Sequence, residues 1–251
     1  MSKISEIIEN SGDREITASL SLKLSIPKAD DRYRVMNLQG GGSDGEYGYF
    51  AMTEHGRQPG MLTKIVKVDL ATWQTVGEGN FLPLDHANDI CYDSKNHRLV
   101  VSHCQIEREA VSFVDPDTLT VTGKTYIRAG GQYAIAYSPE RERYAVGKSM
   151  CFDVNVLDDD FNLVSTVLGE DGHTQQGMEC DGDYIYCLQS SIRHNYIWCY
   201  TWDGEFVKKI LLPPVGEAEH LFSHGDKLII GFNHGKTKMG DIYEVTLGMG
   251  E

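Results

Sequence analysis

The sequence predicts an all-β fold, a five-bladed β-propeller, and two observations support that prediction. The first is a phrase of the form Q-G-x-x-x-D-G-[DE]-Y, which begins at Gln39 and again at Gln176. The second is that degenerate copies of the phrase open at Asn88, Tyr133 and Glu219, which makes the spacings 49, 45, 43 and 43 residues. Repeats of this length, each built from four short strands, are typical of propeller blades.

The repeated phrase has the pattern of a β-hairpin. Each copy contains a short apolar strand, a tight turn such as Asp44-Gly45 or Asp181-Gly182, and a second apolar strand. Asp and Gly favour such turns because they tolerate the backbone angles of a tight reversal. A second hairpin with an Asp-rich turn follows, for example at Asp115. We therefore expect one domain, 1–251, with blades at about 34–84, 85–131, 132–174, 175–217 and 218–251.

The last of these blades is one strand short before the chain reaches Glu251. Residues 17–26 alternate apolar and polar side chains with the period of a strand. Adding this N-terminal strand to the last blade closes the ring and removes two exposed sheet edges, which otherwise favour aggregation. The alternative is a β-sandwich in which the internal similarity is coincidental.

Composition limits the possible partners and the compartment. The net charge of -14 argues against nucleic acid as a partner, because binding phosphates requires a basic surface. No segment approaches the roughly 18 consecutive apolar residues of a membrane span, and the start of the chain lacks the pattern of a signal peptide. The six cysteines form no C-x-x-C pair. We expect a cytoplasmic protein with reduced thiols and no membrane partner. The sequence carries no signal for the oligomeric state.

The repeat also predicts where a ligand binds. The inner strands of a propeller surround a central channel, so the residues that open each copy should meet at one mouth of it. These residues are all polar, although the strands that follow are apolar. We expect them to bind a small-molecule substrate. The predicted ring consists of Gln39, Asn88, Tyr133, Gln176 and Glu219. The alternative is a channel in which they bind only water.

Candidate catalytic groups lie beside two members of this ring. His86 and Asp89 flank the opening of the second blade, and His220 follows Glu219 in the fifth. An imidazole beside carboxylates can exchange protons near neutral pH. Asp85, His86, Asn88, Asp89 and His103 could also hold a divalent metal, but their spacing matches no ligand motif, so we predict no cofactor.

Three arginines occupy loops that should rise to the same mouth. They connect the second and third strands of their blades, at Arg57, Arg108 and Arg193. Guanidinium groups there could hold the carboxylate or phosphate of an anionic substrate. The alternative for each one is a solvated loop cation.

The repeat resembles those of NHL-like and YVTN-like propellers, which also pair an inner hairpin with an Asp-marked outer turn. The Q-G opening at Gln39, followed by Lys64–Asp69 after a loop, is also similar to the five-bladed glutaminyl cyclases of plants and bacteria. That resemblance covers one blade. It implies a glutamate near the pocket that handles proton transfers, for which Glu54 is the candidate. The later blades lack the F-G-E-G segment of that family.

Two functions of different class follow from these patterns. The first is an enzyme, a lyase, cyclase or hydrolase, that binds a small polar or anionic substrate at the channel mouth and acts by acid–base chemistry. Its proton-transferring residues would be His86, Asp89, Glu219 and His220. The second is a non-catalytic propeller that binds a sugar or a peptide at the same ring.

Overall fold

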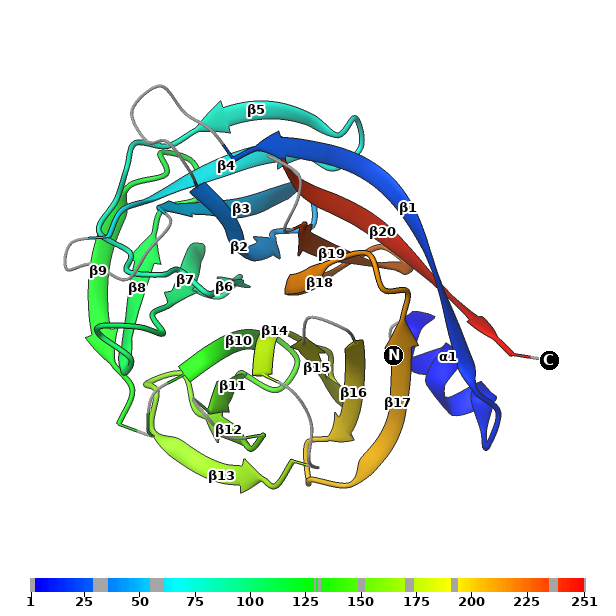
Figure 1. The fold of residues 1–251 in the computed structure, drawn as a ribbon. Helices are drawn as coiled ribbons and strands as arrows, with labels where there is room; N and C mark the ends of the chain where they lie inside the picture. Colours follow the sequence, from blue (N-terminus) through cyan, green and yellow to red (C-terminus); the bar gives the residue numbers. More distant parts are fainter. Residues whose placement is uncertain are drawn as a thin grey trace.

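The protein is a five-bladed β-propeller, and the predicted all-β fold and number of blades are confirmed. The computed structural model describes residues 3–28, 36–54, 61–128, 130, 132–148, 152–169, 174–190, 194–234 and 239–250. Within these ranges, five four-stranded antiparallel sheets are arranged in a ring around a central axis (Figure 1). No helix in the described part of the chain is long and apolar enough to cross a membrane.

Four of the blades are built from consecutive strands, from the channel outward. The first blade consists of β2 (Met36–Ser43), β3 (Tyr47–Glu54), β4 (Thr63–Asp69) and β5 (Gln74–Glu78). The second consists of β6 (Asp89–Asp93), β7 (Arg98–Ser102), β8 (Ala110–Val114) and β9 (Val121–Tyr126). The third consists of β10 (Gln132–Ser138), β11 (Arg143–Lys148), β12 (Val154–Leu157) and β13 (Leu163–Val167). The fourth consists of β14 (Thr174–Cys180), β15 (Tyr184–Ser190), β16 (Asn195–Thr201) and β17 (Phe206–Leu212).

The fifth blade combines the two ends of the chain, as the sequence predicted. Its inner strands are β18 (Glu217–His224), β19 (Lys227–Asn233) and β20 (Met239–Met249). Its outermost strand is β1 (Ile16–Pro27), which pairs with β20 in antiparallel register from one end to the other. Figure 1 shows the two long strands side by side. Residues far apart in the sequence therefore close the ring.

The hydrophobic core lies between the blades. Five clusters of buried apolar side chains are found among the described residues, and each joins two neighbouring blades. Between the fifth and first blades, for example, the rings of Phe50 and Phe222 are 5.8 Å apart. Helix α1 (Lys3–Ser11) adds Ile4 and Ile8 to the cluster between the fourth and fifth blades. These two residues are four apart, so they share one face of the helix.

The aspartates of the repeated phrase hold turns. Oδ1 of Asp44 accepts hydrogen bonds from the amides of Glu46 and Tyr47, and its Oδ2 accepts one from the hydroxyl of Tyr49 at 2.6 Å. Asp181 makes the same set of bonds in the fourth blade. The Asp-Gly half of the phrase is therefore architectural.

The opening residue of the phrase lies in a β-bulge. In four blades of the described structure, the pairing between the two inner strands slips near the start of the innermost one. The slips lie between Leu38 and Gly41, Gln132 and Ile135, Gln175 and Gly177, and Ala218 and His220. A bulge breaks the two-residue alternation of a strand and redirects one side chain. Gln39, Tyr133, Gln176 and Glu219 all fall within these slips.

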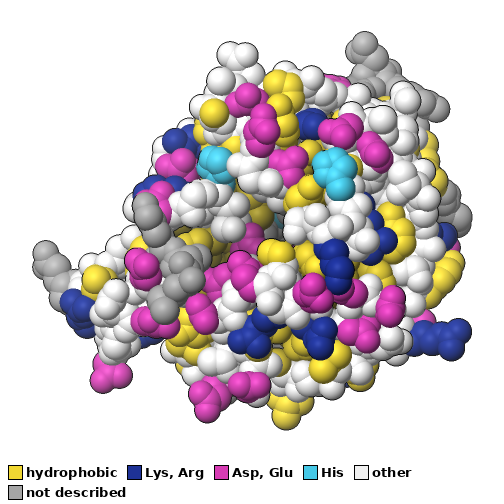
Figure 2. Space-filling model, turned by 180° about the vertical axis from the view of Figure 1, so that it is seen from behind, with side chains coloured by type: hydrophobic (Ala, Val, Ile, Leu, Met, Phe, Trp, Pro, Cys, Tyr) yellow, Lys and Arg dark blue, Asp and Glu magenta, His cyan; other side chains and the backbone are white. Residues whose placement is uncertain are grey.

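Glycines allow the inner strands to approach one another closely at the middle of the channel. A Cβ added to Gly40 would lie 2.8 Å from Cα of Asp89, and one added to Gly177 would lie 2.6 Å from Cα of His220. Separations this short exclude any larger residue without movement of the backbone. The channel is therefore narrow at its centre and widens toward both ends. Figure 2 shows one face of the ring hollowed at its centre, with acidic side chains bordering the hollow.

Candidate functional site

A polar cavity lies at the end of the channel where the inner strands begin, and we call it the polar mouth. It has two adjoining lobes that share His86, Gln176 and Glu217. The first lobe, of about 310 Å³, is lined by these three residues with Lys28, Asn37, Gln39, Glu219, Asn233 and His234. The second, of about 330 Å³, is lined by the same three with Asn88, Cys104, Gln105, Arg108, Tyr133 and Thr174.

All five residues of the predicted ring line the polar mouth. Gln39 and Glu219 contribute to the first lobe, Asn88 and Tyr133 to the second, and Gln176 to both. Four of them reach the channel because of the bulges described above. Asn88 instead precedes β6, where its amide donates a hydrogen bond to the carbonyl of Ser102. The structure therefore brings together residues that the sequence spreads over about 180 positions.

Glu219 is a buried carboxyl group in the first lobe. Only 3% of the residue is exposed, and its Oε1 accepts a hydrogen bond from Nδ2 of Asn233 at 2.7 Å. Burial and the nearby charge of Glu217 raise the pKa of Glu219 well above its ordinary value. The bond from Asn233 and the charge of Lys28 oppose that rise without cancelling it. Glu219 therefore holds its proton at a higher pH than an exposed glutamate does.

Lys28 is the counterpart of Glu219 in the same lobe. It directly follows β1, is 8% exposed, and its Nζ lies 3.5 Å from the carbonyl oxygen of His234. Burial lowers the pKa of Lys28, while the charges of Glu219, Asp241 and Glu217 act in the opposite direction. The pKa values of the carboxyl group and of the amine in this lobe are thus both shifted toward neutral pH.

Two of the four predicted catalytic side chains lie outside the polar mouth. Asp89 is fully buried, and its Oδ2 accepts hydrogen bonds from the amides of Ile135 and Met178, each at 3.0 Å. It therefore ties the second blade to the third and fourth. Nδ1 of His220 lies 2.7 Å from the carbonyl oxygen of Gln39, and its ring is 5.4 Å from that of Phe50.

The burial of both groups favours their uncharged forms. Burial raises the pKa of Asp89 well above its ordinary value, although hydrogen bonds from backbone amides oppose the rise. Burial lowers the pKa of His220 to about 4. The bulge between Ala218 and His220 explains the placement of His220, because it turns Glu219 into the channel and leaves His220 between the fifth and first blades. The pairing of β6 with β7 has no such slip, and Asp89 is held instead by the amides of the third and fourth blades. Neither side chain lines either lobe of the polar mouth, and the contacts of both are those of structural residues, so their catalytic role stays a prediction.

Asn88 lines the mouth but is also part of the scaffold. Its Nδ2 donates to the carbonyl oxygens of Tyr133 at 2.9 Å and Gln176 at 3.2 Å, which belong to two other blades. Its Oδ1 lies 3.4 Å from the thiol of Cys104. The amide group therefore fixes the positions of two other ring residues.

The remaining predicted side chains are divided between the mouth and its rim. His86 borders both lobes, and its Nδ1 lies 3.0 Å from Nε2 of Gln105. Arg108 is exposed at the second lobe, where its Nε donates to the carbonyl of Gln105 at 3.2 Å. Arg57 and Arg193 lie outside the described residues. Among the residues that are described, no three His, Cys, Asp or Glu side chains are grouped so that they could hold a metal ion.

Known structures share this fold. No family model and no curated protein matches the sequence. A glutaminyl cyclase from Myxococcus xanthus is similar in structure, with a TM-score of 0.63 and 13% identity over 95% of this chain and 99% of that one. The tail fibre of Staphylococcus aureus phage P68 has a TM-score of 0.65 and 12% identity, over 92% of this chain and 52% of its own. A chain of the nidogen/laminin complex has a TM-score of 0.57 and 10% identity, over 92% and 98%. At these identities the likeness shows the fold alone.

The glutamate that the resemblance to glutaminyl cyclases implied lies elsewhere. Glu54 ends β3, and its Oε2 accepts a hydrogen bond from the amide of Leu62 at 2.9 Å. It lines neither lobe of the polar mouth. Glu54 is therefore bonded to Leu62, just before β4, and in this chain Glu219 is the buried carboxyl group of the polar mouth.

Sequence reasoning missed Lys28, Asn233 and Glu217, which line the polar mouth. Lys28 had a usable signal, because it directly follows the strand predicted to close the fifth blade. Asn233 ends β19 opposite Glu217, which begins β18, and His234 directly follows it. Glu217 opens β18 and accepts a hydrogen bond from Nε2 of Gln176 at 3.3 Å. Lys28 and Asn233 belong to the outermost and second strands of the fifth blade, whereas the repeated phrase marks the innermost strands, and Glu217 lies two residues before the opening of its copy.

Proposed function

We propose that the polar mouth is the active site of an enzyme that acts on a small polar or anionic substrate by acid–base chemistry, as a cyclase, lyase or hydrolase. Glu219 is the proton-transferring group in this proposal. The observation that supports it is the pairing in one lobe of a buried carboxyl group and a buried amine. Perturbed groups that converge on one cavity are typical of functional sites.

The chemistry follows from the two shifted groups. A general acid or base works best when its pKa lies near the operating pH, and burial moves both Glu219 and Lys28 in that direction. Protonated Glu219 can give its proton to a leaving group and take one back in a later step. The ammonium group of Lys28 can bind the anionic part of a substrate or stabilise a developing negative charge. In this proposal His86, which borders both lobes, acts as a second base.

The carboxamides of the mouth suit the binding of a polar substrate. Gln39 and Gln176 come from inner strands on different sides of the channel, and each offers a donor and an acceptor. Arg108, in the second lobe, supplies a positive charge at the rim. We propose that these groups orient the substrate over Glu219.

The alternative is a binding module without catalysis. A sugar-binding site of this kind is expected to present aromatic rings on which the sugar stacks. Among the described residues that line the mouth, Tyr133 is the one aromatic side chain of the Phe, Tyr and Trp class. This scarcity favours the enzyme.

A substrate panel with matched variants tests the proposal. The panel contains peptides with an N-terminal glutamine, small lactones and amides, and amino acids that can lose ammonia, with products identified by mass spectrometry. Glu219→Gln keeps the shape of the side chain and should lower the rate of the active reaction about 10²–10⁴-fold. Glu205→Gln, on an exposed turn of the fourth blade, is the control and should leave the rate unchanged. Equal rates for wild type and Glu219→Gln would contradict the proposal, and binding of panel compounds without any turnover would favour the module.

A further inference from the structure

A second cavity, of about 370 Å³, lies at the opposite end of the channel. It is lined by the far ends of the inner strands, including residues 90–92, 178–181 and 222–223. We call it the acidic mouth. Asp89, which follows Asn88 of the polar mouth and precedes Ile90 of this one, lies between the two cavities. The acidic mouth is therefore separate from the proposed active site.

The charged side chains that line this cavity are all acidic. They are Asp44, Glu140, Glu179 and Asp181, and the described lining residues include no lysine, arginine or histidine. Arg141 follows Glu140 in the chain but is engaged elsewhere. Its Nε donates to the carbonyl of Gly182 at 2.5 Å, and its guanidinium lies 5.3 Å from the centre of the Trp202 ring. The described lining residues thus supply the cavity with negative charge and with no positive charge.

Glu179 is the innermost of these carboxylates. Its Oε1 accepts a hydrogen bond from the amide of Cys180, and its Oε2 accepts one from the amide of Ser223. No cation pairs with it among the described residues. Burial raises the pKa of Glu179, and these amide bonds only partly oppose the rise. A positively charged ligand would stabilise the carboxylate that the protein leaves unpaired.

An independent observation points the same way. Asp89 is fully buried, and its Oδ1 has no hydrogen-bond partner among the described residues. Its Oδ2 is bonded to the amide of Met178, which lines the acidic mouth, and its charge interacts with that of Glu179. Asp89 and Glu179, from the inner strands of the second and fourth blades, are therefore both close to the inner end of the acidic mouth, and neither forms an ion pair among the described residues.

The walls of the cavity add apolar and aromatic surface. Tyr92, Tyr137 and Phe222 line it, together with Ile90 and Met178. The face of an aromatic ring attracts a cation, and apolar side chains favour the burial of a hydrocarbon group. These walls do not suit a hydrated metal ion, which requires a shell of oxygen ligands. They suit an ammonium group that carries an apolar body.

We propose that the acidic mouth binds a small organic cation, with its ammonium group beside Glu179 and its apolar part against Met178 and Phe222. This site does not depend on the proposed activity of the polar mouth.

Calorimetric titration with 2-phenylethylamine tests the site, with 2-phenylethanol as a neutral probe of nearly the same shape. The amine should bind at least tenfold more tightly than the alcohol. Its affinity should rise between pH 5 and pH 8, because Glu179 loses its proton while the amine keeps its own. Equal affinity for the two probes, or no binding of the amine, would overturn the proposal.

Variants locate the bound probe. Glu179→Gln should weaken binding of the amine at least tenfold, whereas Glu205→Gln and Glu219→Gln should leave it unchanged. Because Glu179 accepts two backbone hydrogen bonds, its variant could also unfold, so a second variant is needed. Ser94→Arg places a competing guanidinium on the exposed rim of the cavity without altering those bonds, and it should weaken binding, whereas Ser94→Gln should not. The location would be refuted if Glu219→Gln lost binding of the amine, or if Ser94→Arg bound the amine as tightly as wild type.

Discussion

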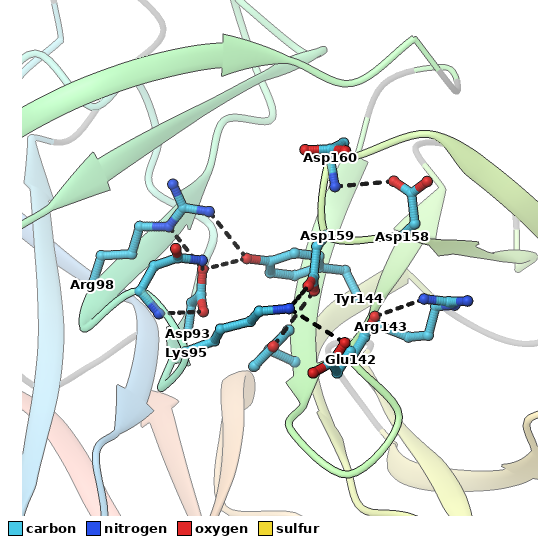
Figure 3. Close-up of polar contacts among 11 residues, drawn as sticks. Asp93, Lys95, Arg98, Glu142, Arg143, Tyr144, Asp158, Asp159 and Asp160 are labelled. Atoms are coloured by element: carbon cyan, nitrogen blue, oxygen red, sulfur yellow. Dashed lines mark hydrogen bonds and ion pairs between the residues drawn. The ribbon is translucent and has the colours of Figure 1, made fainter.

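Replacing Tyr144 by phenylalanine should test how the second and third blades are held together. The hydroxyl of Tyr144 donates to Oδ2 of Asp93 at 2.7 Å, and Figure 3 shows the two side chains meeting from neighbouring blades. Asp93 has no exposed surface, and it also accepts hydrogen bonds from Nδ2 of Asn96 and Nε of Arg98, each at 2.8 Å. The ring of Tyr144 stacks on that of Phe161 at 4.5 Å, and phenylalanine keeps this contact.

The magnitude follows mainly from the lost bond to Asp93, because the other bond of the hydroxyl, accepted from Nη2 of Arg98, is long at 3.4 Å. A hydrogen bond to a charged group contributes about 1.5–3 kcal/mol to the free energy of unfolding. Since the other bonds to Asp93 remain, we expect a loss of about 2 kcal/mol, which for a chain of this length lowers the Tm by about 4–8 °C. Tyr137→Phe is the control, because its hydroxyl lies 3.5 Å from Oδ1 of Asp159 and forms at most a weak bond. Its cost should stay below about 0.5 kcal/mol.

Urea unfolding followed by circular dichroism at several pH values measures both effects. Burial acts to raise the pKa of Asp93, but hydrogen bonds from Tyr144, Asn96 and Arg98 outweigh it and hold the pKa below its ordinary value. A carboxyl group with a lowered folded pKa stabilises the protein above its unfolded pKa, about 3.9, and this contribution is lost as the pH falls through the folded value. The difference between wild type and Tyr144→Phe should therefore persist down to about pH 4 and shrink below it. A difference under about 0.5 kcal/mol at pH 7, or one equal at pH 7 and pH 3, would refute the reasoning.

Three further predictions concern the channel. Gly177→Ala places a Cβ 2.6 Å from backbone atoms of His220 and Leu221, and it should lower the free energy of unfolding in urea by about 3 kcal/mol. Gly77→Ala is the control, because its Cβ would lie 3.7 Å from its nearest neighbour, and it should change stability by less than about 0.5 kcal/mol. Burial lowers the pKa of His220 from about 6.5 in the unfolded chain to about 4 in the folded protein, so its contribution to stability is complete above pH 6.5 and is lost toward pH 4. His220→Gln should therefore reduce the change in the free energy of unfolding between pH 4 and pH 6.5, and an unchanged pH dependence would contradict this. The pKa of Glu219 is raised in the folded protein, so its contribution to stability is present below the unfolded pKa and is lost as the pH rises. At pH 8, Glu219→Gln should therefore unfold at a urea concentration equal to or higher than that of wild type. A lower midpoint would show that the folded protein stabilises the carboxylate of Glu219.

The repeat predicted the architecture because its signals are local. Asp44 and Asp181 each build a turn with residues two and three positions away, so a short window of sequence contains the whole interaction. The closing strand was also predictable, since the alternation of residues 17–26 is visible without its partner.

The site was only partly predictable because its geometry depends on pairing between distant strands. Sequence alone does not show that β18 slips against β19 between Ala218 and His220. That slip sends Glu219 into the mouth and leaves His220 between the blades, so adjacent residues of similar chemistry have different surroundings. Lys28 reaches the same lobe from the outermost strand of its blade, through a pairing with the far end of the chain.

The strand that closes the ring has a consequence for how the protein is made. Because β1 pairs with β20 along its length, β1 cannot form its strand pairing until β20, which is synthesised much later, is available. The first four blades can form on the ribosome while the fifth cannot, and contacts between such distant segments form slowly. Until then, β1 has an unpaired edge and Lys28 is separated from Glu219. We therefore expect the polar mouth to be completed only after β1 and β20 have paired, because this pairing brings Lys28 to the lobe that holds Glu219.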